Sequence, residues 1–215
     1  MFSNISLILF DMDGVITDSI DLWFSAVTNV FIEYFNITPS REKFNKLLHK
    51  STREVVEEFA DFIKPTPELV DKLTNMVDEC FETEMIPKLQ PIKNVEIIVK
   101  ELYKRKYRLG IITNGSEKTS KKMIRQLGLL NHFEHIFGTN GERPKPEPDL
   151  FFKALKQYKV LANECVYIGD SYSDLLASEK AGIHFIYFQN REIPEMASYE
   201  GVKIKTLLDV LSLIK

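Results

Sequence analysis

Two hydrophobic patterns divide the chain. Short apolar runs typical of buried strands occur at 6–10, 109–112, 165–168 and 185–188, with a shorter candidate at 135–137. From residue 92 onward, amphipathic segments with apolar residues at helical spacing separate these runs. This alternation predicts a parallel β-sheet whose strands are connected by helices.

The segment between about residues 20 and 85 has a different pattern. Its apolar residues recur at helical spacing in three stretches, 20–35, 55–63 and 69–81. Prolines at 39, 65 and 67 separate the stretches, and prolines at 87 and 91 bracket the exit. The sequence therefore predicts an all-helical domain over 17–87, inserted into a core formed by 1–16 and 88–215.

Composition narrows the class of protein. The 215 residues are 44% hydrophobic and 27% charged, and the net charge of -3 provides no basic surface for nucleic acid. We expect no membrane segment, because no apolar stretch approaches the ~20 residues that span a bilayer. The N-terminus lacks the basic start of a signal peptide, so a cytoplasmic protein is expected. Cys80 and Cys165 have no spacing that favours a disulfide framework or a zinc site.

The first apolar run ends in two carboxylates, Asp11 and Asp13, followed by Gly14. Side chains two apart on a strand point to the same side, so both acids are expected to converge. Charges at the end of a buried strand are costly unless they are paired or bind a metal. The pair therefore predicts a cation at this position.

Polar groups also follow other predicted strands. Thr113-Asn114-Gly115 follows 109–112, while Gly169-Asp170-Ser171 follows 165–168, with Asp174 four residues beyond Asp170. Because ligands of parallel sheets bind beyond the carboxyl ends of the strands, these clusters are expected to form one site with Lys145. Oxygen ligands beside substrate phosphate suit Mg²⁺. The groups together predict a phosphoryl-transfer site.

In this order, the motifs resemble those of haloacid dehalogenase superfamily hydrolases, in the helical-cap subfamily that contains phosphoglycolate phosphatase and beta-phosphoglucomutase. The resemblance covers nearly the whole chain. It implies an α/β fold: a Rossmann-like parallel-sheet core with helices on both faces and an inserted all-helical cap domain. Because the helical block is inserted into the core, we also expect a mobile cap, with hinges at 17–19 and 87–91.

The resemblance implies a role for each acid. Asp11 would be the nucleophile that forms an aspartyl-phosphate, and Asp13 the general acid and then the general base. Mg²⁺ would be held by the Asp11 carboxylate, the Asp13 backbone carbonyl and the Asp170 carboxylate. Asp174 would support the water shell of the metal or position Lys145.

Phosphate binding is implied for three further residues, Thr113, Asn114 and Lys145. In the predicted cap, Arg53 lies in a segment that resembles the place where mutases of this family bind a distal phosphate. It is a possible specificity residue, and an ordinary surface arginine is an equally good interpretation.

The expected function is a Mg²⁺-dependent phosphatase of a small phosphorylated metabolite. A phosphomutase of the beta-phosphoglucomutase type is an alternative, although such sequences carry a histidine where this chain has Trp23. Dehalogenases lack an acid at the position of Asp13, which disfavours that activity. A non-catalytic phospho-ligand module is also disfavoured, because the motif acids are intact. The sequence leaves the substrate and the oligomeric state open.

Overall fold

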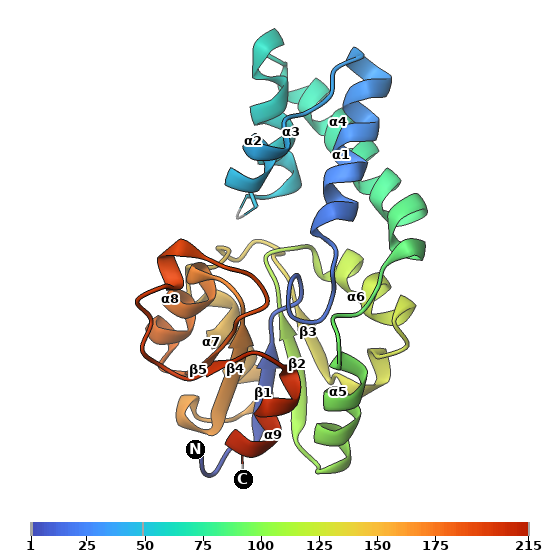
Figure 1. Ribbon diagram of the computed structural model, residues 1–215. Coiled ribbons are helices and arrows are strands. Elements are labelled where there is room, and N and C mark those ends of the chain that lie inside the picture. The colour runs from blue at the N-terminus through green and yellow to red at the C-terminus, as the bar shows by residue number, and fades with distance from the viewer. Residues whose placement is uncertain (1, 49, 215) are drawn as a thin grey trace. The chain divides into compact units, whose positions relative to one another are not determined.

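The computed structural model describes residues 2–48 and 50–214. The chain forms two compact units (Figure 1). An α/β unit comprises the N-terminal segment up to Asp18 and everything from Gln90 onward, and a helical unit comprises Ser19–Leu89. The chain thus leaves the α/β unit after its first strand and returns to it before the second.

The α/β unit is built on one parallel sheet. In the described part of the chain it has six strands, in the order β3-β2-β1-β4-β5-β6. Their bounds are β1 Leu7–Phe10, β2 Arg108–Ile112, β3 His135–Phe137, β4 Cys165–Gly169, β5 His184–Phe188 and β6 Lys203–Ile204. The predicted strands are confirmed. The structure adds β6, which was not predicted because a strand of two residues leaves no pattern in the sequence. The central strand β1 pairs with β2 on one side and β4 on the other.

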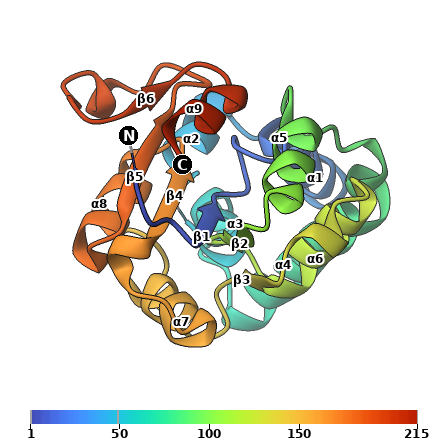
Figure 2. The ribbon, with the colours of Figure 1, turned by 90° about the horizontal axis from the view of Figure 1, so that it is seen from below.

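Helices cover both faces of this sheet (Figure 2). On one face lie α7 (Asp149–Tyr158) and α8 (Tyr172–Ala181), and on the other lie α5 (Val95–Lys104) and α6 (Glu117–Gln126). Leu7 and Leu9 of β1 are fully buried in the core that α7 and α8 cover. Because strand side chains alternate, Ile8 and Phe10 face the opposite core, where Phe10 packs edge-on against Phe133. The sheet is thus buried on both sides, as its continuous apolar strands predict.

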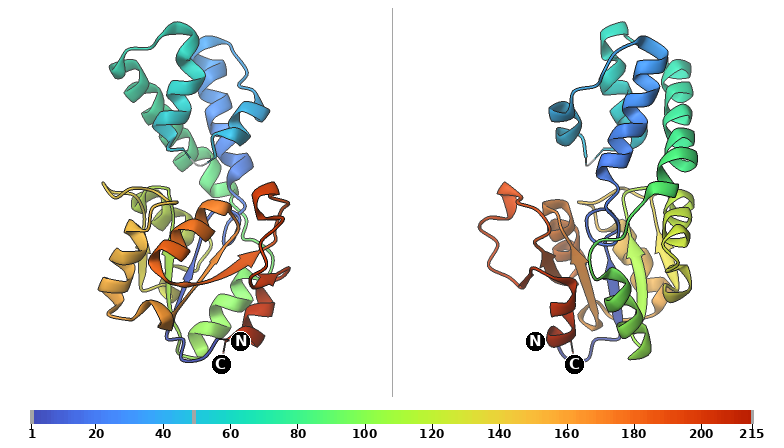
Figure 3. Two further views of the ribbon diagram at one scale, coloured as in Figure 1. Left: turned by 90° about the vertical axis from the view of Figure 1, so that its left-hand side faces the viewer. Right: turned by 45° about the vertical axis from the view of Figure 1, so that its right-hand side comes forward.

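The two ends of the chain meet in this unit. The backbone N–H of Phe2 donates to the carbonyl of Leu213 over 2.7 Å. Leu213 ends the short helix α9 (Val210–Leu213), which packs beside α5. Figure 3 shows the two termini side by side.

The helical unit contains four α-helices in its described part: α1 Ile20–Phe35, α2 Arg41–Lys46, α3 Thr52–Ala60 and α4 Pro67–Cys80. Helix α4 packs against both α1 and α3 (Figure 3). Ser51 and Glu54 form a capping box at the start of α3, and Thr66 caps α4, which has Pro67 in its first turn. The all-helical character predicted for this insertion is confirmed. Helix α2, at only six residues, is too short for a clear apolar stripe.

Short helical turns connect the main elements. A π-helical turn covers Phe81–Met85, and 3₁₀ turns cover Asp61–Ile63, Ile86–Lys88, Leu130–His132, Ala162–Glu164, Pro194–Met196 and Leu207–Asp209. Within 2–48 and 50–214, the structure has no helix with the length and apolar character needed to cross a bilayer.

Candidate active site

The candidate site lies at the carboxyl ends of three neighbouring strands. Asp11 follows β1, Thr113 follows β2 and Asp170 follows β4. The backbone N–H of Asp11 donates to the carbonyl of Ile168 over 2.8 Å, which extends the pairing of β1 with β4 by one residue. The topology therefore brings together polar residues that are up to 159 positions apart in sequence, from Asp11 to Asp170.

The two acids of the first motif have different environments. Asp11 is 7% exposed, whereas Asp13 is half-buried. Strand β1 ends at Phe10, and the chain then turns, with the carbonyl of Met12 accepting hydrogen bonds from Ile16 and Thr17. The alternation of a strand therefore does not extend to Asp13. Its carboxylate instead accepts a 3.4 Å hydrogen bond from the Thr17 hydroxyl.

Gly14 completes this turn. Its φ of +92° is unfavourable for a residue with a side chain. A Cβ at this position would also lie 2.2 Å from Oδ2 of Asp170. Glycine is thus needed twice, once for the backbone and once to let Asp170 approach.

A buried lysine connects the acids. Nζ of Lys145 donates to Oδ1 of Asp11 over 2.5 Å, to Oδ1 of Asp174 over 2.6 Å and to the hydroxyl of Tyr167 over 2.9 Å. These bonds use all three protons of the ammonium group. Lys145 is 4% exposed. Burial by itself lowers its pKa, but the charges of Asp11 and Asp174 outweigh burial, so the pKa is raised and the side chain stays cationic.

Asn114 fixes the backbone that carries Lys145. Its side-chain amide donates to the carbonyl of Lys145 over 3.1 Å, and its side-chain oxygen accepts from the N–H of Lys145 over 2.8 Å. The structure therefore shows the Asn114 side chain occupied by this loop. Thr113, which is 1% exposed, accepts a 3.0 Å hydrogen bond from the N–H of Gly115, so its side chain holds the turn that follows β2.

Asp174 is fully buried and extensively hydrogen-bonded. Besides Lys145, the Tyr167 hydroxyl donates to Oδ1 over 2.7 Å, and the N–H and hydroxyl of Ser171 donate to Oδ2. Burial raises the pKa of this carboxyl, but Lys145 and the other donors outweigh that effect and lower it. Ser171 and Asp174 also form the capping box of α8. The carboxylate of Asp174 thus positions Lys145 and begins a helix.

Asp170 differs from Asp174 in that its charge is poorly compensated. It is 1% exposed, and its Oδ2 has no hydrogen-bond partner among the described residues. Burial raises the pKa of Asp170 to about 7, against the lowering effect of Arg191, whose Nε lies 3.3 Å from Oδ2. A buried carboxylate oxygen without a donor is suited to a cation.

The acid cluster, which we define as Asp11, Asp170 and Asp174, has the geometry of a metal site. One carboxylate oxygen of each residue lies within 4.8 Å of those of the others. Burial, followed by the charge of Asp174, raises the pKa of Asp11 in spite of Lys145. Because a divalent cation would favour the ionised carboxylates, this donor set fits a hard, oxygen-binding ion such as Mg²⁺. Five donor groups, including the backbone N–H of Asp170, already hydrogen-bond to the Asp174 carboxylate, which leaves Asp11 and Asp170 as the better side-chain ligands.

Arg53 and Trp23 belong to the helical unit. Arg53, in the first turn of α3, forms an ion pair with Asp71 of α4. Trp23 packs edge-on against Phe44 with ring centroids 5.2 Å apart, which is a core contact of this unit.

Two residues beside the acids were missed by the sequence interpretation, Tyr167 and Arg191. Tyr167 could have been predicted to contact the site, because it lies in the fully buried strand β4 and a buried hydroxyl needs a hydrogen-bond partner. Arg191 lies in an irregular loop after β5 without a recognisable motif.

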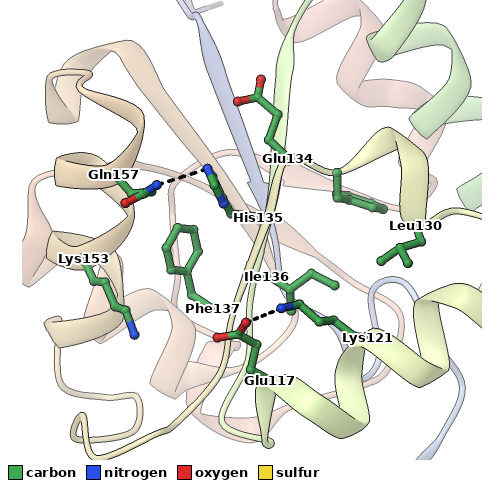
Figure 4. A pocket seen from close by; sticks show the side chains of 10 residues that line it. Glu117, Lys121, Leu130, Glu134, His135, Ile136, Phe137, Lys153 and Gln157 are labelled. Carbon is green, nitrogen blue, oxygen red and sulfur yellow. Dashed lines mark hydrogen bonds and ion pairs between the residues drawn. The ribbon is translucent and has the colours of Figure 1, made fainter.

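A separate pocket of about 230 Å³ lies at the β3 edge of the sheet (Figure 4). It is lined by residues of β3, α6 and α7, including His135, Lys121 and Gln157. Glu117 pairs with Lys121 and His135 with Gln157 inside the pocket, while Glu134 and Lys153 pair with Arg108 and Glu142 outside its lining. None of its lining residues is among those predicted for the active site.

Comparisons with known proteins in sequence and in structure all point to the same protein family. The family model described as haloacid dehalogenase-like hydrolase matches residues 8–188. A phosphorylated carbohydrates phosphatase of Thermotoga maritima is 26% identical, over 95% of this chain and 97% of that protein. A glyceraldehyde 3-phosphate phosphatase of Pyrococcus furiosus is 31% identical, over 57% of this chain and 55% of that protein. Among solved structures, one described as a predicted phosphoglycolate phosphatase from Haemophilus somnus superposes with a TM-score of 0.86 at 16% identity, covering 98% of each chain, which shows the shared fold.

Proposed function

Because the chain belongs to the haloacid dehalogenase-like hydrolase family, we propose that it is a Mg²⁺-dependent phosphatase of a small phosphorylated metabolite. The strongest support is the buried network in which Lys145 bridges Asp11 and Asp174. Buried charges are expensive to maintain, so a network of this kind at the ends of parallel strands favours catalysis over packing. The network holds Asp11 next to a fixed positive charge, as a nucleophile that attacks an anion requires.

The catalytic sequence is a double displacement at phosphorus. A carboxylate oxygen of Asp11 attacks the phosphorus atom, the bond to the leaving oxygen breaks, and Asp13 gives that oxygen a proton. Asp13 then removes a proton from water, the water oxygen attacks phosphorus, and the Asp11–phosphorus bond breaks. Inorganic phosphate leaves and both aspartates return to their starting states.

The half-buried setting of Asp13 supports this division of roles. A group that exchanges protons with a leaving alcohol and with water needs contact with solvent, which Asp13 has and Asp11 largely lacks. Lys145 and the Thr113 hydroxyl are the proposed contacts of the transferring phosphoryl group. For Asn114 we propose an indirect contribution, because its side chain holds the backbone of Lys145.

We assign the Mg²⁺ ion to the carboxylates of Asp11 and Asp170 and the backbone carbonyl of Asp13. The buried, unpartnered Oδ2 of Asp170 supports this assignment. When bound, the ion supplies positive charge that stabilises phosphate oxygens and lowers the pKa of nearby carboxylates. Asp174 takes part through Lys145.

The proposed substrates are small phosphate monoesters, such as carbohydrate phosphates and phosphoglycolate. The named activities of the relatives support this class. We further propose that the helical unit acts as the cap that selects among these substrates. Arg53 remains a candidate for that selection, although its ion pair with Asp71 would have to open for it to bind a second anionic group.

The test is phosphate release from an aryl phosphate with and without Mg²⁺, followed by a screen of phosphorylated metabolites. Asp11→Asn should reduce the rate by roughly a thousandfold or more, because it removes the nucleophile. Asp61→Asn makes the same change at an exposed position of the helical unit and should leave the rate unchanged. Release by Asp11→Asn at the wild-type rate, or no dependence on a divalent cation, would reject the proposal.

A further inference from the structure

Arg191 faces the acid cluster from a loop outside the predicted motifs. Its Nε lies 3.3 Å from Oδ2 of Asp170, yet neither atom has a hydrogen bond within the described residues. The two groups are therefore held by charge and not by a directed hydrogen bond. The side chain of Arg191 is 35% exposed and that of Asp170 is 1% exposed, so the arginine has room to move and the aspartate does not.

The loop that carries Arg191 is anchored next to the site. The side-chain amide of Asn190 donates to the carbonyl of Gly14 over 3.1 Å. The hydroxyl of Tyr187 reaches the carbonyl of Arg191 over 3.4 Å. One anchor thus joins this loop to the turn that follows Asp11, and the other fixes the backbone of Arg191 itself. The position of its guanidinium beside Asp170 is therefore a product of the fold.

Charge explains why a cation is needed at this position. The three carboxylates of the acid cluster face one ammonium group, and all three protons of Lys145 are used by Asp11, Asp174 and Tyr167. Lys145 therefore gives Asp170 no hydrogen bond. Arg191 is the cation that lies closest to the unpartnered oxygen of Asp170 among the ion pairs of the described chain. A divalent ion at the same carboxylate would supply that charge and would repel the guanidinium.

We propose that Arg191 is a positioning residue that neutralises Asp170 in the metal-free enzyme and gives up this contact when the divalent cation binds. The inference rests on the metal site of the proposed function. Arg191 therefore lowers the affinity for the divalent cation, because the cation must displace the Arg191–Asp170 ion pair to bind. Replacing Arg191 should therefore strengthen cation binding and lower the thermal stability of the metal-free protein.

Calorimetric titration with Mg²⁺ of the wild type, Arg191→Gln and Arg191→Lys tests this inference. All variants are titrated in the same buffer at the same pH. We expect Arg191→Gln to bind Mg²⁺ about fivefold or more tightly than the wild type. Arg191→Lys keeps the charge and should stay close to the wild type. Arg105→Gln is the matched control, since it breaks an exposed ion pair with Glu101 at the end of α5.

Thermal unfolding gives a second readout. Without metal, Arg191→Gln should melt below the wild type, because a buried carboxylate loses its counter-charge. With saturating Mg²⁺ the difference should shrink, because the variant gains more stabilisation from the ion. If Arg191→Gln does not fold, Asn190→Ala removes the loop anchor and should shift Mg²⁺ affinity in the same direction by a smaller factor.

Equal or weaker Mg²⁺ binding by Arg191→Gln would overturn the inference and leave the proposed function intact. Unchanged Mg²⁺ binding with weaker inhibition by inorganic phosphate would also overturn it, since Arg191 would then be a phosphate ligand. If the wild type binds neither Mg²⁺ nor Mn²⁺, the metal site of the proposed function fails, and this inference fails with it.

Discussion

The α/β unit and the helical unit treat charge differently. Among the described residues, every buried charged side chain lies in the α/β unit: Asp11, Lys145, Asp170 and Asp174. The ion pairs of the helical unit are partly exposed, such as Arg41 with Asp21 and Lys50 with Glu58. The helical unit is held together by apolar packing and helix caps. Its described residues include no cluster of buried charges.

This difference fits the proposed division, in which the α/β unit carries out the chemistry and the helical unit selects the substrate. Buried charges strengthen one another's interactions because the surrounding dielectric constant is low, and they keep fixed positions because they are packed. Exposed charges are weakened by water and salt and move easily. We therefore place bond making in the α/β unit and assign to the helical unit the choice of substrate. The following predictions test that contrast.

Lys145→Met should have the largest effect on stability and should also abolish turnover. It leaves the carboxylates of Asp11 and Asp174 buried without their counter-charge, at a cost of about 3–5 kcal/mol. Lys180→Met is the control, because Lys180 pairs with Glu147 at the surface and should cost about 0–1 kcal/mol. Urea unfolding of both variants measures the difference. Similar losses would show that burial of the Lys145 network has no special energetic weight.

Two glycines with positive φ offer a matched test of the approach between Gly14 and Asp170. Gly141 has a φ of +108°, and a Cβ added there would have no neighbouring atom within 4 Å, so Gly141→Ala should cost only backbone strain, about 1 kcal/mol. Gly14→Ala adds a clash with the Asp170 carboxylate and should cost at least about 2 kcal/mol. Unfolding measurements compare the two, and Mg²⁺ titration should show weaker binding for Gly14→Ala only. Equal costs would mean that Asp170 moves away freely.

In the helical unit, the capping box of α3 should matter for stability but not for chemistry. Ser51→Ala removes the side-chain acceptor of the N–H of Glu54 and should cost about 1 kcal/mol. Ser51→Thr keeps a hydroxyl and should cost less. The rate with an aryl phosphate should stay within about twofold of the wild type at a temperature where both are folded. A large fall in that rate with unchanged stability would place α3 in the chemical step.

The two cysteines, one in each unit, allow a comparison of how accessible a thiol is in the two units, and this is the smallest of the expected effects. Cys165 on β4 is fully buried, and burial raises the pKa of its thiol. Cys80 at the end of α4 is half-buried. A thiol reagent should therefore modify Cys80 in the native protein at least about a hundredfold faster than Cys165, which reacts after unfolding. Mass spectrometry of digested protein gives both rates, and equal rates would indicate that β4 opens readily.

Much of the fold followed from the hydrophobic pattern because the sheet is parallel and buried on both faces. Strands such as 165–168 then appear as continuous apolar runs, and the polar residue after each run marks the end of the sheet where ligands bind. Helix α2 and strand β6 escaped prediction, because six and two residues do not establish a period.

The site was harder to predict in its details. Strand alternation suggested that Asp11 and Asp13 converge, but the chain leaves the strand at Phe10, so the turn decides where Asp13 lies. Asn114 holds the backbone of Lys145 through two hydrogen bonds between residues 31 positions apart, a contact that local sequence does not encode. The same holds for Arg191, which reaches Asp170 only through the folded loop after β5.

The central claim is that Asp11 carries the phosphoryl group during turnover. Rapid quenching with acid, followed by borohydride reduction and peptide mass spectrometry, tests it most directly, because borohydride converts an aspartyl-phosphate to homoserine. We predict homoserine at position 11, formed only when Mg²⁺ and a phosphate ester are both present. Homoserine at another carboxylate, or an unmodified Asp11 while the alcohol is released faster than phosphate, would contradict it.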